Sequence, residues 1–124
     1  RLKLAVAFQM LFPGSPAVYY GEEIGMQGEN DPGCRAGMTW DGMDEELLTW
    51  TRRWIRFRHE HEVIRKGKYR TLLADRQKGL FVFERASQEE HIVAVFNRSA
   101  QPQDFAAAGG TVTVPAHAVE IIIS

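Results

Sequence analysis

The sequence predicts an α+β fragment in which helix, strand and helix elements precede an antiparallel all-β sandwich domain. Three observations point to this fold class. In the first 66 positions, apolar residues recur at the three-and-four spacing of helices. From Lys68 onward they alternate with polar residues, as they do in half-buried strands. Turn-forming runs such as Asp75–Gly79 separate these later segments at short intervals.

The first predicted helix covers Arg1–Phe12, which is rich in Leu, Lys, Ala, Gln and Met, and ends at Pro13 and Gly14. The short apolar run Ala17–Tyr20 follows, bounded by proline and glycine. Such a run predicts a strand buried on both faces of a parallel sheet. A parallel strand needs a parallel neighbour, and this sequence supplies none. We therefore expect the first half to come from a larger α/β sheet or barrel.

A long loop is predicted over Gly21–Asp44, because this segment is rich in glycine and has no periodicity. Loops of this length are uncommon in compact domains and are usually functional or disordered. Its tryptophan and methionines argue against disorder. Asp44 is the predicted cap of the next helix and Gly67 its predicted stop. Trp50 and Trp54 fall on the apolar face of this helix and are expected in the core.

The remaining residues predict a small β-domain, because they form short runs rich in Val, Ile, Phe and Thr. The predicted strands are Tyr69–Ala74, Leu80–Arg85, His91–Asn97, Thr111–Pro115 and Ala118–Ile123, with a further short strand at Gln101–Phe105. Regular short strands separated by turns are typical of an antiparallel sandwich. Two domains follow from this division, residues 1–66 and residues 67–124.

Composition excludes several classes of function. The formal net charge of −1 provides no basic surface for nucleic acid or an anionic membrane. No run of 18 apolar residues exists that would predict a membrane span. The single cysteine, Cys34, excludes an internal disulfide framework and fits a reducing, cytoplasmic location. His59 and His61 lie two positions apart and so on different faces of a helix, which argues against a metal site.

Three motifs in the first half resemble the end of the catalytic barrel in α-amylase superfamily enzymes. They are GSPAVYYGEEIG at Gly14–Gly25, NDPGCR at Asn30–Arg35 and MTWD at Met38–Asp41. The closer likeness is to the neopullulanase, cyclomaltodextrinase and maltogenic amylase group. The run RRWIRFRHEHEVIRKGKY is similar to the eighth barrel helix and its exit into a C-terminal β-domain.

The resemblance implies that residues 1–66 are the last part of a (β/α)8 barrel, with its eighth strand and helix, and that residues 67–124 are the β-sandwich. It implies a parent glycoside hydrolase of the retaining type, acting on α-1,4 or also α-1,6 links in maltooligosaccharides, cyclodextrins or pullulan. A transferase or isomerase reaction stays open as an alternative. Such chemistry needs two carboxyl groups about 5 Å apart. By the resemblance they precede Arg1, so the chain alone is expected to be inactive. It needs no cofactor, and the sequence leaves a calcium site in the parent open.

Asp31 and Arg35 are the predicted substrate contacts, because the resemblance places this pair at the donor-side sugar near the −3 subsite. A structural ion pair that holds the loop is the alternative interpretation, and both roles are compatible. Tyr20 and Trp40 are candidates for supporting the substrate loop. Glu22 and Glu23 are further candidates for that support. They are not expected to be the catalytic pair, because neighbouring residues in an extended segment point in opposite directions.

The expected partner is an α-glucan oligosaccharide, bound through the parent protein. A non-enzymatic carbohydrate-binding or interaction β-domain module is the alternative, and a small protein unrelated to amylases is a third hypothesis. Outside a barrel, the apolar faces of Leu2–Phe12 and Ala17–Tyr20 would be uncovered. We therefore also expect self-association through these faces.

Overall fold

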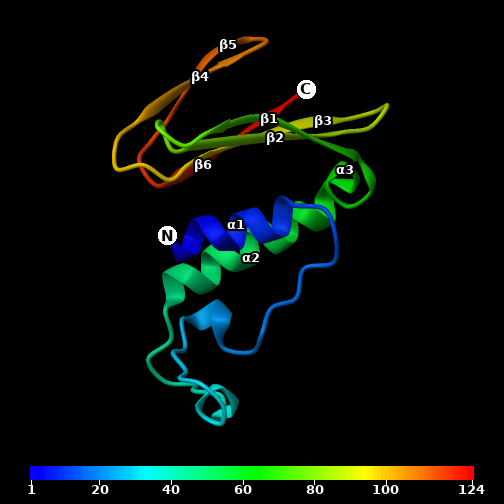
Figure 1. Ribbon diagram of the computed structural model, residues 1–124. Helices are drawn as coiled ribbons and strands as arrows, with labels where there is room; N and C mark the ends of the chain where they lie inside the picture. The colour runs from blue at the N-terminus through cyan, green and yellow to red at the C-terminus, as the bar shows by residue number, and fades with distance from the viewer.

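The computed structural model describes residues 1–124 and arranges them in layers (Figure 1). Helices α1 (Leu2–Leu11), α2 (Glu45–Glu60) and α3 (Glu62–Lys66) lie on one side of a β-sheet. The segment between α1 and α2 extends away from the sheet and contains two short 3-10 helices, η1 (Glu22–Ile24) and η2 (Gly33–Arg35). The strands are β1 (Lys68–Asp75), β2 (Leu80–Ala86), β3 (His91–Asn97), β4 (Gln103–Ala107), β5 (Gly110–Val114) and β6 (Ala118–Ile123). None of the helices is both long and apolar enough to span a membrane.

The β-domain consists of a four-stranded sheet and a separate hairpin. The strand order in the sheet is β1-β2-β3-β6, and β4 pairs with β5 in the hairpin. All pairs are antiparallel, and β2 and β3 align Phe83 with Ala94. The antiparallel fold class is therefore confirmed, and the predicted strand ends are within two residues of the observed ones.

Alternation along the strands places apolar side chains on both faces of the sheet. Phe83 and Phe96 face the helices, whereas Val82 and Val95 face the β4–β5 hairpin. The helix-side cluster consists of Ala7, Met10, Leu11, Trp54, Val63, Ile64, Phe83, Ile92, Ala94 and Phe96. Its members come from both sides of position 66, so the helices and the sheet share one core. The predicted domain boundary itself stays a prediction.

Helix α2 begins at its predicted cap, because the Leu47 N–H donates to Asp44 Oδ1 at 2.9 Å. The prediction of one continuous helix to Lys66 is wrong. His61 has an extended backbone, which ends α2 and starts α3, and its ring Nδ1 bonds to Glu90 Oε1 in the β2–β3 turn. The side-chain partner lies 29 positions away in sequence, so local propensity could not reveal the interruption.

The predicted buried strand at Ala17–Tyr20 is also wrong. These residues form no β-ladder, Tyr20 already belongs to a turn, and 51% of Tyr19 and 43% of Tyr20 are exposed. A strand is defined by hydrogen bonds to a neighbouring strand, and no other segment of this chain lies alongside to provide them.

Glu84 on β2 makes stability depend on pH. Its carboxylate accepts hydrogen bonds from His91 Nε2 at 2.7 Å and from Arg70 Nε at 2.6 Å. These bonds, that from His91 first, lower the pKa of Glu84 below its usual value of 4.5. A depressed carboxyl pKa contributes stability that is complete above the unfolded value and is lost as the pH falls through the folded value. We expect the free energy of unfolding to fall as the pH is lowered from about 5 toward 3.

Urea unfolding of Glu84→Gln across the same pH range measures this contribution. The variant should be less stable than the wild type at pH 6 and should lose less stability on acidification. Glu120→Gln on β6 is the control, because Glu120 is exposed and forms no ion pair. Equal acid sensitivity in the wild type and Glu84→Gln would contradict the assignment.

Candidate functional site

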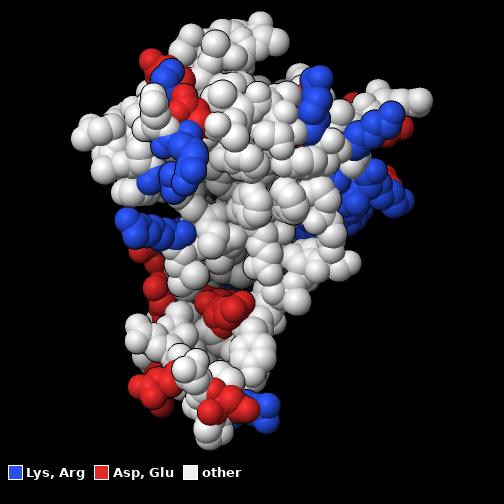
Figure 2. All heavy atoms as spheres, viewed as in Figure 1, with Lys and Arg blue, Asp and Glu red and all other residues white.

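The segment between α1 and α2 forms an acidic projection beneath the helices. Figure 2 shows red carboxylates gathered over this lower part, whereas blue side chains lie mostly over the helices and the sheet. The acidic residues of the projection are Glu22, Glu23, Glu29, Asp31, Asp41 and Asp44, and its only basic residue is Arg35. Carboxylates and one guanidinium, which can hydrogen-bond to sugar hydroxyl groups, are therefore concentrated in the segment where the sequence predicts a sugar site.

Two adjacent tyrosines support the projection from within. The ring centroids of Tyr19 and Tyr20 lie 4.8 Å apart. The Tyr20 hydroxyl donates to the Ala36 carbonyl at 2.7 Å, and that of Tyr19 to the Cys34 carbonyl at 3.2 Å. Desolvation, and then the adjacent Tyr20, raise the pKa of Tyr19 above its usual value of 10.0. Both tyrosines therefore bind the same stretch of loop, although strand alternation predicts opposite faces.

The turn after the tyrosines requires a glycine at position 21. Gly21 has φ +90°, and a Cβ atom there would lie 2.5 Å from Met26 Sδ.

The turn that follows Gly21 places the two glutamates differently. Glu22 Oε2 accepts from the Tyr19 N–H at 3.3 Å, whereas Glu23 Oε2 is buried without a hydrogen-bond partner. Glu22 thus binds loop backbone, and its role toward a substrate stays a prediction.

Asp31 and Arg35 come together as an ion pair at the end of the projection. Arg35 Nε lies 3.1 Å from Asp31 Oδ1, and the two side chains are 72% and 60% exposed. An exposed pair of this kind contributes about 0–1 kcal/mol to stability. The pair leaves further donors and acceptors free for sugar hydroxyl groups. Trp40 is 73% exposed, so its ring faces are accessible for stacking.

The projection encloses only a small hollow of about 190 Å³, lined by residues that include Tyr19, Tyr20, Met26 and Cys34. Ligand pockets commonly measure about 300–1,000 Å³, so this hollow is too small to hold an oligosaccharide by itself. No group of three or more His, Cys, Asp or Glu side chains is arranged to hold a metal ion.

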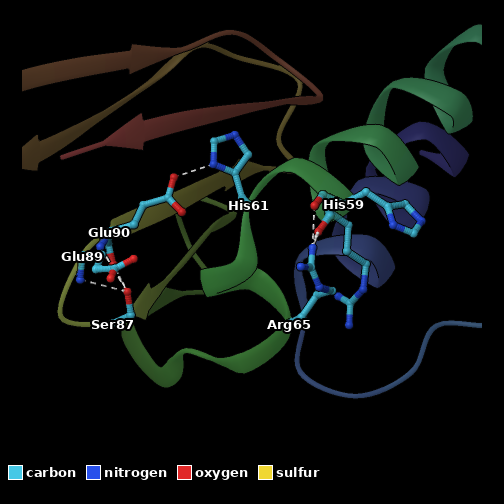
Figure 3. Close-up of polar contacts among 7 residues, drawn as sticks. His59, His61, Arg65, Ser87, Glu89 and Glu90 are labelled. Atoms are coloured by element: carbon cyan, nitrogen blue, oxygen red, sulfur yellow. Dashed lines mark hydrogen bonds and ion pairs between the residues drawn. The ribbon is translucent and has the colours of Figure 1, made fainter.

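The two histidines of the HEHE run point in different directions (Figure 3). His61 bonds to Glu90 and contacts the Phe57 ring at a tilt of 37°, with ring centroids 4.2 Å apart. His59 is exposed, and its carbonyl accepts from Arg65 Nη1 at 2.6 Å. The His61 contact connects the helices to the β2–β3 turn, the His59 contact joins α2 to α3, and the two bring no ligand set together.

Sequence reasoning missed two contributors to this region. Strand alternation predicts that Tyr19 faces away from Tyr20, and no pattern in the sequence marks Arg58 of α2, which holds the start of the projection. No periodicity signal could have identified Arg58, because its acceptors are main-chain carbonyls more than 40 positions away.

Curated relatives match most of this chain. It is 38% identical over 105 residues to neopullulanase 2 of Thermoactinomyces vulgaris. The match covers 83% of this chain and 18% of that protein. It is 38% identical over 101 residues to a cyclomaltodextrinase of Geobacillus thermopakistaniensis, covering 80% and 17%. It is 32% identical over 120 residues to a maltogenic α-amylase of Bacillus acidopullulyticus, covering 90% and 20%. The chain thus spans about a fifth of the length of these relatives.

Solved structures share the fold over nearly the whole chain. A cyclic α-maltosyl-(1→6)-maltose hydrolase from Arthrobacter globiformis, in complex with that sugar, has a TM-score of 0.89 at 25% identity, covering 98% of this chain and 29% of that one. A maltogenic amylase from S. marinus has a TM-score of 0.82 at 28% identity, covering 97% and 19%. No family model matches the chain.

Proposed function

Because this chain belongs to the α-amylase family, as a segment homologous to neopullulanases, cyclomaltodextrinases and maltogenic amylases, we propose that it forms one wall of a sugar site in an α-glucan-cleaving enzyme. The parent would hydrolyse α-1,4 links, and α-1,6 links where its site admits the branch. The observation that carries the proposal is the exposed Asp31–Arg35 pair, presented within the motif NDPGCR on an acidic projection.

The pair suits recognition of a sugar. A carboxylate accepts hydrogen bonds from hydroxyl groups, and the arginine fork donates to hydroxyl oxygens. Each side chain fixes the other, so little conformational freedom is lost when a sugar binds. Tyr20, Glu22, Glu23 and Trp40 are proposed to hold this loop, with Trp40 also available for ring stacking. Such a wall acts only when the rest of the site faces it.

We propose that the reacting carboxyl groups belong to parts of the parent outside these 124 residues. Two features support this. The relatives are about five times as long as the matched segment. Glu22 binds loop backbone and Glu23 has a buried oxygen, whereas retaining hydrolysis needs two carboxyl groups facing one bond.

The native protein, isolated with an antibody to the β-domain, tests the proposal. We expect a mass several times the 14.1 kDa of this chain and release of reducing sugar from cyclodextrin or pullulan. A native mass near 14.1 kDa, together with tight maltooligosaccharide binding and no hydrolysis, would instead favour a carbohydrate-binding module. If the native protein neither binds nor hydrolyses α-glucans, both the enzyme proposal and the binding-module alternative are overturned.

Removing the paired carboxylate should weaken substrate binding. In the native enzyme, Asp31→Ala is expected to raise KM for maltotetraose about tenfold, with a smaller effect on kcat, because one charge-assisted hydrogen bond is lost. Glu29→Ala is the matched control, since Glu29 is an exposed acid of the same loop without an ion pair. Identical kinetics for the two variants would show that Asp31 does not contact the substrate.

A further inference from the structure

The C-terminal end of α1 lacks the usual glycine cap. The last carbonyls of a helix have no partner within the helix and need donors from elsewhere. Phe12 follows α1 with an extended backbone (φ −73°, ψ 154°), and Pro13 comes next. No Schellman turn can form there, because that motif needs a left-handed residue after the helix. Side chains or water must therefore satisfy these carbonyls where the chain leaves α1 toward the acidic projection.

Arg58 of α2 provides most of the donors. Its Nη1 donates to the Met10 carbonyl at 2.6 Å and to the Phe12 carbonyl at 3.2 Å. Its Nη2 donates to the Gly14 carbonyl. One guanidinium thus binds three carbonyls along the exit of α1. These bonds set the direction in which the segment from Pro13 leaves the helix.

Arg85 of β2 supplies the remaining contact from the sheet side. It is 2% exposed, and its Nη1 donates to the Leu11 carbonyl at 3.3 Å. Its Nη2 donates to the Gly67 carbonyl at 2.8 Å, at the junction of α3 and β1. Arg58 and Arg85 form no ion pair with any carboxylate. Both are therefore committed to main-chain carbonyls.

We propose that Arg58 and Arg85, here called the arginine clamp, are positioning residues for the candidate sugar site: they fix the exit of α1 and thereby the placement of the projection that carries Asp31 and Arg35. Through Arg85 the β-domain has a part in this placement, in addition to covering the helices. The expected effect of the arginine clamp on sugar binding rests on the proposed function. Its expected effect on the order of the loop does not depend on that function.

The chemistry explains why arginine occupies these positions. A guanidinium presents donors in a rigid fork and stays charged even when partly buried. Desolvation lowers the pKa of both side chains, with further lowering of Arg58 by the charge of Arg65 and of Arg85 by the charge of Arg58. The partial negative charge at the end of α1 favours cations there. A lysine could not reach several carbonyls in one plane.

Hydrogen exchange of the native protein tests the clamp. In Arg58→Met, we expect amides of Phe12–Arg35 to exchange about tenfold faster, because the carbonyls at the exit lose their donor. Amides of β2 and β3 should keep the wild-type rates. Arg56→Met is the matched control, because Arg56 lies on the same helix, is exposed and forms no hydrogen bond or ion pair through its side chain. It should leave both regions unchanged.

Each outcome decides the proposal. Unchanged exchange of Phe12–Arg35 in Arg58→Met would overturn it. If exchange instead rises throughout the protein, Arg58→Lys decides, since it keeps the charge and most of the stem. An increase confined to the loop then supports the clamp, and an increase everywhere or nowhere overturns it. The KM for maltotetraose is a separate readout: a wild type without glucan activity would refute the proposed function and leave the exchange result to judge the clamp.

Discussion

Replacing Trp54 with alanine is expected to lower the free energy of unfolding by about 3–5 kcal/mol, the largest effect of any single substitution predicted for this chain. Trp54 is 2% exposed and lies in the core shared by helices and sheet. Its ring contacts Trp50 and Phe57, with centroids 5.7 and 5.6 Å away, and Arg53 lies over it at 5.3 Å. Alanine would leave a cavity between the helices and the sheet, and the surrounding side chains could not move in to fill it.

Urea unfolding of Trp54→Ala and Trp54→Phe measures the effect. The Trp54 Nε1–H is buried without an acceptor, so phenylalanine removes an unsatisfied donor while it keeps most of the ring. We expect Trp54→Phe to cost much less than Trp54→Ala. Similar losses for the two variants would contradict this expectation and show that the smaller phenylalanine ring does not fill the space of the indole.

Replacing Asn97 with alanine is expected to cost about 3 kcal/mol, because several buried polar groups lose their partner at once. Asn97 is fully buried at the end of β3. Its Nδ2 lies 2.7, 3.0 and 2.9 Å from the carbonyls of Gln101, Val114 and Pro115. Its Oδ1 accepts from the N–H and hydroxyl of Ser99 at 2.9 and 2.8 Å. One amide side chain thus joins the β3–β4 connection to the end of β5.

Thermal unfolding checks this prediction, with Asn30→Ala as the control. Asn30 is exposed in the projection, and only its main-chain carbonyl takes part in a hydrogen bond. We expect the midpoint of Asn97→Ala to fall by several degrees relative to Asn30→Ala. A midpoint equal to that of the control would mean that water replaces the amide, and that the hairpin is held by its apolar contacts alone.

The elements that sequence reasoning predicted best are those whose partners are near in sequence. The strands of the β-domain are short runs rich in β-branched and aromatic residues, and β1, β2 and β3 pair in sequence across short turns. The cap of α2 is a contact between residues three positions apart, Asp44 and Leu47. Such local rules need no knowledge of the rest of the fold.

The predictions that were wrong depended on distant partners. Ala17–Tyr20 has the composition of a buried strand, but composition cannot provide the neighbour that a strand requires. At the helix break, the His61 ring bonds to Glu90 in the β2–β3 turn, a partner 29 positions away. At the site, sequence predicted the pairing of Asp31 with Arg35, which is a local contact. It could not predict that Tyr19 and Tyr20 would bind the same stretch of loop, since that depends on how the turn at Gly21 folds back.

By itself the sequence determined the antiparallel β-domain, the amphipathic helix before it, the acidic composition of the projection and the family resemblance, because each is expressed in periodicity or in short motifs. Only the tertiary structure decided that helices and sheet share one core and that Arg58 and Arg85 hold the exit of α1. The physical reason is that an arginine donating to main-chain carbonyls leaves no pattern in sequence, since any residue can supply the carbonyl.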